Sequence, residues 1–159
     1  MLLVSLALCT SSFLCFALAE PTYRVISVID GNTIQIMTTD GERVQILLYG
    51  VDSPDEGQKF FMEAKLLLEG SLLNKMVTLI DRGKDRYGNR IAEVTAKEVH
   101  DPQRELLRSG LEWTSQSDPE LEALKEQARK QGLGIWADEN PMPPWLYRRQ
   151  QSMLKPKTN

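Results

Sequence analysis

Two aspartates, Asp52 and Asp55, flank a proline directly after an apolar stretch of the chain. Carboxylate oxygens in such a position can bind a hard cation such as Ca²⁺. Turns also favour aspartate, serine and proline, so a solvent-exposed turn with two acids is the alternative interpretation. The chemistry open to this pair depends on the elements that carry it.

The apolar stretch before the two acids has the pattern of a strand. Val44, Ile46 and Leu48 recur with a period of two, which predicts a strand with one buried face. Pro54 lacks a backbone N–H and disfavours helix at the residue before it, so the strand must end there. The two acids are therefore expected at the rim of the sheet to which this strand belongs.

The composition predicts one globular domain. The chain has 159 residues, of which 26% are charged and 42% are hydrophobic. Its net charge of −3 provides no overall attraction to nucleic acid, so we expect nucleic acid or a nucleotide to bind weakly, through a local basic patch. A protein partner fits the same composition, and we expect a monomer.

The first 19 residues have the features of a secretory signal peptide. They contain no charged residue and end in Ala-Leu-Ala before Glu20. We expect cleavage there, a secreted or periplasmic protein, and no membrane association afterwards. An uncleaved N-terminal anchor is the alternative, because the segment is close to the length that spans a bilayer. Both cysteines, Cys9 and Cys15, lie in this segment, so the mature chain would have no thiol chemistry.

The remaining chain predicts short strands, helices and a tail. Five strands are expected, at residues 23–29, 33–37, 42–49, 76–80 and 90–95. Three helices are expected, at residues 57–73, 101–110 and 118–132. This order predicts an α+β domain at residues 20–140, built on a five-stranded OB-fold barrel. Residues 141–159 form a C-terminal tail that contains proline and tryptophan, and its segment 141–145 (PMPPW) is expected to be neither regular helix nor central strand.

Three separated segments resemble motifs of the staphylococcal nuclease (thermonuclease) family. Residues 28–33 (VIDGNT) resemble its V-(I/V)-D-G-D-T turn, residues 50–55 (GVDSPD) its G-(I/V)-D-(T/A/S)-P-E motif, and residues 85–89 (DRYGN) its D-(K/R)-Y-G-R motif. Order and spacing agree as well, and the resemblance extends from Tyr23 to Arg149. It implies an SNase-like barrel and Ca²⁺-dependent hydrolysis of phosphodiesters in DNA and RNA.

Carried over residue by residue, the resemblance implies a weakened catalytic centre. Asp52, the Ser53 carbonyl and Asn32 fall on the calcium ligands, and Asp55 falls on the glutamate usually cast as general base. Asn32 replaces an aspartate, so one ligand charge is lost and the affinity for Ca²⁺ is expected to fall. Asp55 is shorter than glutamate, which limits its reach to an attacking water.

The two arginines that the family uses on the phosphate fall on Leu47 and Asn89. Neither residue can supply a charged, bidentate donor. Arg90 follows Asn89, but neighbouring strand residues point to opposite faces, so it could substitute only through a bulge. The loss of one such arginine can cost about 10³–10⁵ in rate.

Some phosphate-binding residues are kept. Arg86 and Tyr87 match the family's phosphate-binding pair, and Lys84 adds a positive charge to the same loop. We therefore expect a secreted nuclease-fold domain with a degraded active site that hydrolyses poorly or not at all but binds a nucleotide, a polyanion or a protein. A slow Ca²⁺-dependent nuclease and a pure protein-interaction module are the alternatives.

Overall fold

The computed structural model describes residues 21–97 and 101–154. The expected signal peptide, residues 1–19, lies outside the described residues. Among the helices of the described ranges, none has both the length and the apolar character that crossing a membrane requires.

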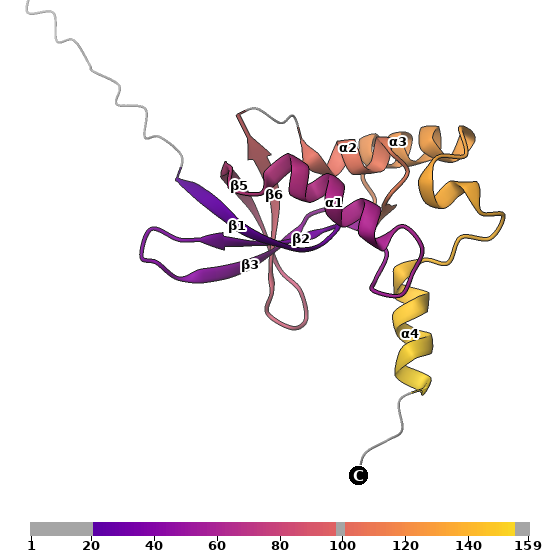
Figure 1. Ribbon diagram of the computed structural model, residues 1–159, viewed down its shortest axis with the longest axis horizontal. Coiled ribbons are helices and arrows are strands. Elements are labelled where there is room, and N and C mark those ends of the chain that lie inside the picture. Colours follow the sequence, from indigo (N-terminus) through magenta and orange to yellow (C-terminus); the bar gives the residue numbers. More distant parts are fainter. Residues whose placement is uncertain (1–20, 98–100, 155–159) are drawn as a thin grey trace, which may run out of the picture.

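A closed barrel of five strands forms one half of the molecule (Figure 1). Its strands are β1 (Thr22–Asp30), β2 (Thr33–Met37), β3 (Arg43–Leu48), β5 (Met76–Lys84) and β6 (Arg90–Ala96). They follow one another in the order β1-β2-β3-β6-β5, and β5 pairs back to β1. The pair β3–β6 is parallel and the other pairs are antiparallel. The five-stranded barrel expected from the sequence is confirmed.

Strand β5 is longer than the sequence pattern predicts. The strand was expected to end at Ile80 but continues through a polar segment to Lys84. Cross-strand ion pairs hold this extension to β6, among them Arg82 with Glu93. Because charged pairs replace apolar alternation here, a search for hydrophobic periodicity misses these residues.

A second, two-stranded sheet lies beside the barrel. It consists of β4 (Val51–Asp52) and β7 (Trp113–Thr114), and it pairs Asp52 with Trp113. Strands of two residues have no measurable period, so this pairing could not be predicted from the sequence. The pairing places Asp52 against a segment that lies far away in the sequence.

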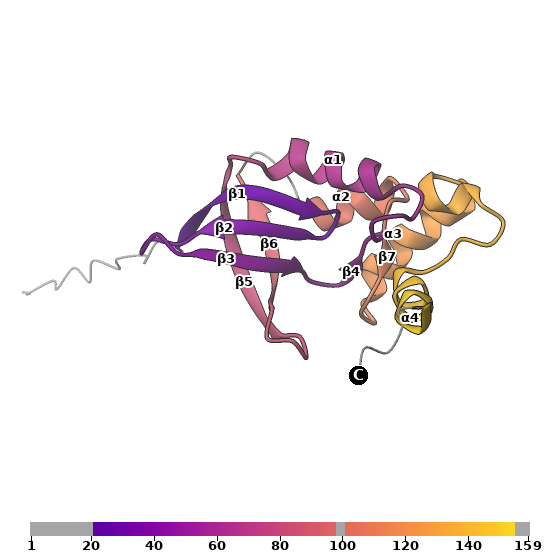
Figure 2. The same cartoon turned by 60° about the horizontal axis from the view of Figure 1, so that its bottom comes forward.

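The helices gather at one end of the barrel (Figure 2). They are α1 (Phe61–Leu72), α2 (Pro102–Arg108), α3 (Pro119–Lys130), a 3₁₀ turn η1 (Gly134–Ala137) and α4 (Pro144–Leu154). Asp101 and Asp118 cap α2 and α3 with their side chains, and a proline follows each cap, as the sequence predicts.

The expectation that residues 141–145 contain no regular helix is wrong for Pro144 and Trp145, which begin helix α4. This fourth α-helix also exceeds the expected number of three. Pro144 occupies the first position of α4, where a helix requires no N–H. The Pro143 carbonyl accepts the first two hydrogen bonds, from the backbone N–H groups of Leu146 and Tyr147, at 3.1 Å each. The prolines thus start the helix instead of preventing it.

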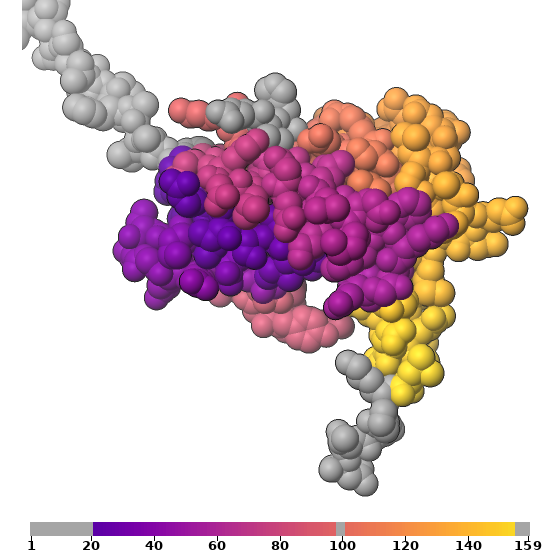
Figure 3. All heavy atoms as spheres, in the orientation of Figure 1, coloured from indigo at the N-terminus to yellow at the C-terminus, as the bar shows by residue number. Residues whose placement is uncertain are grey.

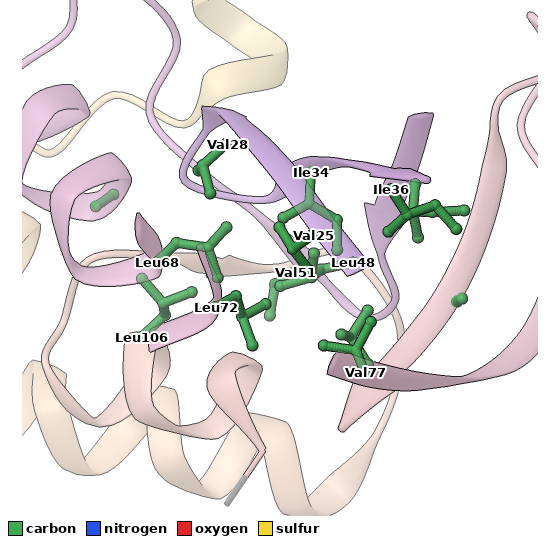
Figure 4. Close-up of a cluster of buried hydrophobic side chains, with 14 of the residues drawn as sticks. Val25, Val28, Ile34, Ile36, Leu48, Val51, Leu68, Leu72, Val77 and Leu106 are labelled. Carbon is green, nitrogen blue, oxygen red and sulfur yellow. The ribbon is translucent and has the colours of Figure 1, made fainter. Parts of the chain in front are cut away.

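The hydrophobic core joins the barrel to α1 (Figure 4). Ile34, Ile36 and Ile46 are fully buried inside the barrel, and Leu68 and Leu72 of α1 are fully buried against it. Each such side chain contributes about 1.5–3 kcal/mol through burial. This packing fixes the ends of β1 and β3, from which the residues of the predicted site extend.

The turn between β1 and β2 is packed against both α1 and the segment after β4. A Cβ atom at Gly31 would lie 2.7 Å from the Cβ atoms of Ala64 and Ser53. Only glycine allows this approach without displacement of the backbone. Gly31 therefore sets the distance between the turn that carries Asn32 and the segment that carries Asp52.

One acid, Glu112, is buried in the interior. Both carboxylate oxygens are inaccessible to solvent and have no hydrogen-bond partner. Burial raises the pKa of the Glu112 carboxyl well above its usual value, and the nearby charges of Asp52 and Asp30 raise the pKa further. At a pH between the unfolded and the folded pKa of Glu112, the folded protein therefore holds a proton on this carboxyl that the unfolded chain releases.

We expect Gly31→Ala to lower the free energy of unfolding by about 1–3 kcal/mol, because the added methyl group overpacks the turn. Gly70→Ala in α1 is the matched control, since a Cβ there meets nothing within 4 Å, and it should be neutral or stabilising by up to about 1 kcal/mol. Urea unfolding of both variants measures the difference. Equal stability of the two would contradict the packing of Gly31.

We expect Glu112→Gln to remove part of the pH dependence of stability. Because the folded pKa is raised, the wild-type free energy of unfolding is greatest below the unfolded pKa and falls as the pH rises toward the folded value, by about 1.4 kcal/mol per pH unit. The stability of Glu112→Gln relative to wild type should therefore increase from pH 4.5 upward. Urea unfolding between pH 4 and 8 measures this, and parallel curves for the two proteins would count against a buried neutral carboxyl.

Candidate functional site

The two acids of the central motif lie together at the edge of the small sheet. Asp52 ends β4, and Asp55 lies in the loop that leads to α1. The Asp55 N–H donates to the Gln58 side chain, and the Gln58 N–H donates to the Asp55 carbonyl, both at 2.9 Å. These two bonds fix the conformation of the loop. The Asp52 side chain is 15% exposed and the Asp55 side chain is 32% exposed.

The guanidinium of Arg148, on helix α4, binds both acids. Its Nη1 donates to Asp52 Oδ1 at 3.1 Å and to Asp55 Oδ1 and Oδ2 at 3.2 and 3.1 Å, and its Nη2 donates to Asp52 Oδ2 at 2.7 Å. All four carboxylate oxygens are therefore bound to one cation. Arg148 was not predicted as a site residue, and the only available signal was that the resemblance to the family extends as far as Arg149.

The cluster has defined electrostatics. Burial raises the pKa of the Asp55 carboxyl, and the Arg148 guanidinium offsets only part of this effect. The hydrogen bond to Asp52 raises the pKa of the Arg148 guanidinium above its usual value. Arg148 thus carries its full charge wherever the acids are ionised.

Asn32 lies beside this cluster but is used as a structural bridge. Its amide nitrogen donates to the Val51 carbonyl at 3.2 Å, and its amide oxygen accepts a hydrogen bond from Ser53 Oγ at 3.0 Å. An aspartate could not donate to Val51. The amide therefore joins the β1–β2 turn to β4 through bonds that involve both of its polar atoms.

The residues that the resemblance assigns to calcium do not fit that ion as they are arranged. Ca²⁺ takes six to eight oxygen ligands, several of them charged. Here the oxygens of Asp52 and Asp55 already accept bonds from Arg148, and Asn32 is neutral. In residues 21–97 and 101–154, no three histidine, cysteine or acidic side chains are grouped so that they could hold a metal.

Leu47 and Asn89, the two positions at which the resemblance places the family's phosphate-binding arginines, carry no charge. Leu47 is a half-buried residue of β3, paired with Thr33 on one side and with Ile91 on the other. Asn89 donates from its side chain to Asp85 at 2.9 Å and so closes its own loop.

Arg90, the substitute considered from the sequence, is committed elsewhere. Its guanidinium donates to Asp81 Oδ2 at 2.9 Å, across the hairpin from β6 to β5.

The tip of the β5–β6 hairpin presents the predicted phosphate-binding residues to solvent. Asp85 accepts backbone hydrogen bonds from Tyr87 and Asn89, and the side-chain bond from Asn89 lowers the pKa of the Asp85 carboxyl. The closed turn leaves Lys84, Arg86 and Tyr87 exposed. Arg86 lies 4.7 Å from the centre of the Tyr87 ring, whose residue is 74% exposed.

Hairpin tip and helix α4 extend from the same side of the molecule in both ribbon views (Figures 1 and 2). The space-filling view shows both projecting beyond the body of the protein (Figure 3). The structure therefore brings Asn32, Ser53, Asp52 and Asp55 together as the sequence predicts, adds Arg148 to them, and leaves the basic hairpin tip as a separate projection.

Comparison with known proteins agrees with this geometry. The family model described as staphylococcal nuclease homologue matches residues 45–138. A protein of Escherichia coli O157:H7 named "uncharacterized endonuclease" is 32% identical over 128 residues, which cover 79% of this chain and 83% of that protein.

Two further relatives extend the comparison. An "uncharacterized endonuclease" of Haemophilus influenzae is 30% identical over 155 residues, which cover 96% of this chain and 86% of the relative. A "micrococcal nuclease" of Shigella flexneri is 25% identical over 139 residues, which cover 79% of each chain. With its closed barrel, its paired acids and these matches, the chain belongs to the staphylococcal nuclease homologue family.

Proposed function

We propose that this protein binds single-stranded nucleic acid on a nuclease scaffold and has strongly reduced or no phosphodiester hydrolysis. The observation that carries the proposal is the contact of Arg148 with both acids. Asp52 and Asp55 are the residues that would position a metal and a water, and the Arg148 guanidinium already forms an ion pair with each of them.

The charge that the reaction would need supports the same conclusion. Phosphoryl transfer is accelerated mainly by positive groups that stabilise charge on the transferred phosphate. Leu47 is neutral, the Asn89 amide is bonded to Asp85, and the Arg148 guanidinium is bonded to carboxylates. None of the three can strengthen its contact with a phosphate as charge builds in the transition state.

Binding requires less than catalysis, and the hairpin tip provides what it needs. Lys84 and Arg86 are exposed and form no ion pair with the acidic side chains of the described ranges. Single-stranded nucleic acids bind to basic surfaces on which aromatic rings stack with bases. Tyr87, next to Arg86, is such a ring. The net charge of −3 limits the affinity.

The proposal predicts that the purified protein degrades single-stranded DNA in CaCl₂ at least about 10³-fold more slowly than an active member of the family, because both arginine positions are substituted. Gel analysis of a labelled oligonucleotide over time measures the rate. Asp52→Ala serves as the control for contamination. Rapid Ca²⁺-dependent degradation that Asp52→Ala abolishes would overturn the loss of hydrolysis.

We further expect Arg86→Ala to weaken the binding of a labelled single-stranded oligonucleotide about tenfold, because it removes a phosphate contact. The logarithm of the binding constant should fall with the logarithm of salt concentration by about 0.7 per contact, so the variant should show a shallower slope. Fluorescence anisotropy at several NaCl concentrations measures both values.

Arg129→Ala is the matched control for that experiment. Arg129 is an exposed arginine in the last turn of α3, where it pairs with Glu126. The substitution Arg129→Ala should leave the affinity for the oligonucleotide and the slope of its salt dependence unchanged. If Arg86→Ala and Arg129→Ala bind alike, the hairpin tip is not the binding surface.

A further inference from the structure

We propose that Arg148 is the resident cation of the Asp52–Asp55 site and that helix α4 is a clasp that holds it there, so that Arg148 and a divalent cation exclude each other. This inference rests on the proposed function, in which the same contact blocks the acids. It predicts cation binding and helix position, however, and neither depends on hydrolysis.

Arg148 occupies the acids in the way a bound cation would. A single guanidinium bridges the two carboxylates and contacts all four of their oxygens, at 2.7 to 3.2 Å. Pairing of arginine with carboxylates through two nitrogens is among the stronger charged interactions in proteins. A metal ion would need the same oxygens and would carry the same sign of charge, so both cannot be bound together.

Because Asn32 is neutral, a singly charged guanidinium is sufficient to offset much of the negative charge of this site. With a neutral amide at position 32, the two acids that contact Arg148, Asp52 and Asp55, carry two negative charges, of which Arg148 offsets one, and Asp30 adds a further negative charge nearby. Ca²⁺ affinity increases with the number of charged ligands. A third acid would therefore favour a divalent ion over arginine, and the bonds of Asn32 to Val51 and Ser53 show that its amide has a different use here.

Helix α4 is held mainly through the turn that carries Arg148. Trp145 packs edge-on against Trp113 with ring centres 5.5 Å apart, and the Tyr147 hydroxyl donates to the Glu56 carbonyl at 3.2 Å. Residues 149–154 are all exposed, and the ribbon shows this half of the helix extending away from the body (Figure 1). The position of α4 thus depends on contacts of its first turns, and the ion pairs of Arg148 with Asp52 and Asp55 are among them.

These contacts define a two-state equilibrium. With the clasp closed, Arg148 covers the acids. With it open, the acids face solvent and can accept a cation. The apparent dissociation constant for the cation equals the intrinsic constant divided by the open fraction. If the clasp is open about one tenth of the time, the apparent affinity for the cation falls about tenfold.

The first test measures Ca²⁺ binding by calorimetry at constant ionic strength. Arg148→Ala should bind Ca²⁺ at least about tenfold more tightly than wild type. The Ca²⁺ affinity of Arg148→Lys should lie between these two, because lysine keeps the positive charge but cannot bind a carboxylate through two nitrogens. Arg149→Ala is the matched control. It removes the same charge from the next residue, whose side chain forms no ion pair with the acids of the described ranges, and it should match wild type.

Equal Ca²⁺ affinity in wild type, Arg148→Ala and Arg149→Ala would overturn the proposal, and so would the absence of detectable binding in all three. Circular dichroism and melting curves establish that each variant is folded. If Arg148→Ala does not fold, the comparison of Arg148→Lys with Arg149→Ala decides the question in the same way.

The second test uses the wild-type protein alone. Saturating CaCl₂ should increase amide hydrogen exchange in residues 144–154 at least severalfold and leave strands β2 and β3 unchanged, because only the clasp opens. The same protein in calcium-free buffer, with NaCl added to match the ionic strength, is the reference. Binding of Ca²⁺ with unchanged or increased protection of α4 would overturn the clasp. Neither test involves hydrolysis, so its result is separable from that of the nuclease assay.

Discussion

Two carboxylates held close together and partly away from water require a positive charge, and the way this protein meets that requirement shapes the rest of its site. Asp52 and Asp55 are carried by a short strand and a hydrogen-bonded loop, so they cannot move apart to reduce their repulsion. Arg148 supplies the charge. Arg148 belongs to the last described helix. The charge balance of Asp52 and Asp55 therefore depends on where helix α4 lies.

The barrel makes this requirement strict. Its core packs α1 against the strands, and the close approach at Gly31 fixes the turn that carries Asn32 against the segment after β4. A rigid support of this kind is suited to catalysis, where groups must be held in position. In this chain the same support holds an amide that bridges two segments and two acids that share one guanidinium.

The basic hairpin tip is independent of that change. Lys84, Arg86 and Tyr87 are presented by a turn that Asp85 closes with its own hydrogen bonds, and they need no support from the acids. Contacts to phosphate that depend on charge and exposure can therefore survive when the catalytic contacts do not. In the function that we propose, this separation lets a nuclease fold keep a surface for nucleic acid while Arg148 occupies the two acids.

The sequence alone predicted the five strands of the barrel and three of the helices, because alternation and caps are local patterns. That Asn32, Ser53, Asp52 and Asp55 lie together was implied by the resemblance to the nuclease family and by no local pattern. Only the tertiary structure decided what these residues do. Helix α4 begins at prolines that were expected to prevent it, and β4 pairs with β7 over two residues. The ion pair of Arg148 with Asp52 joins residues 96 positions apart. No local pattern encodes such a contact, since it depends on where a terminal helix lies once the core has formed.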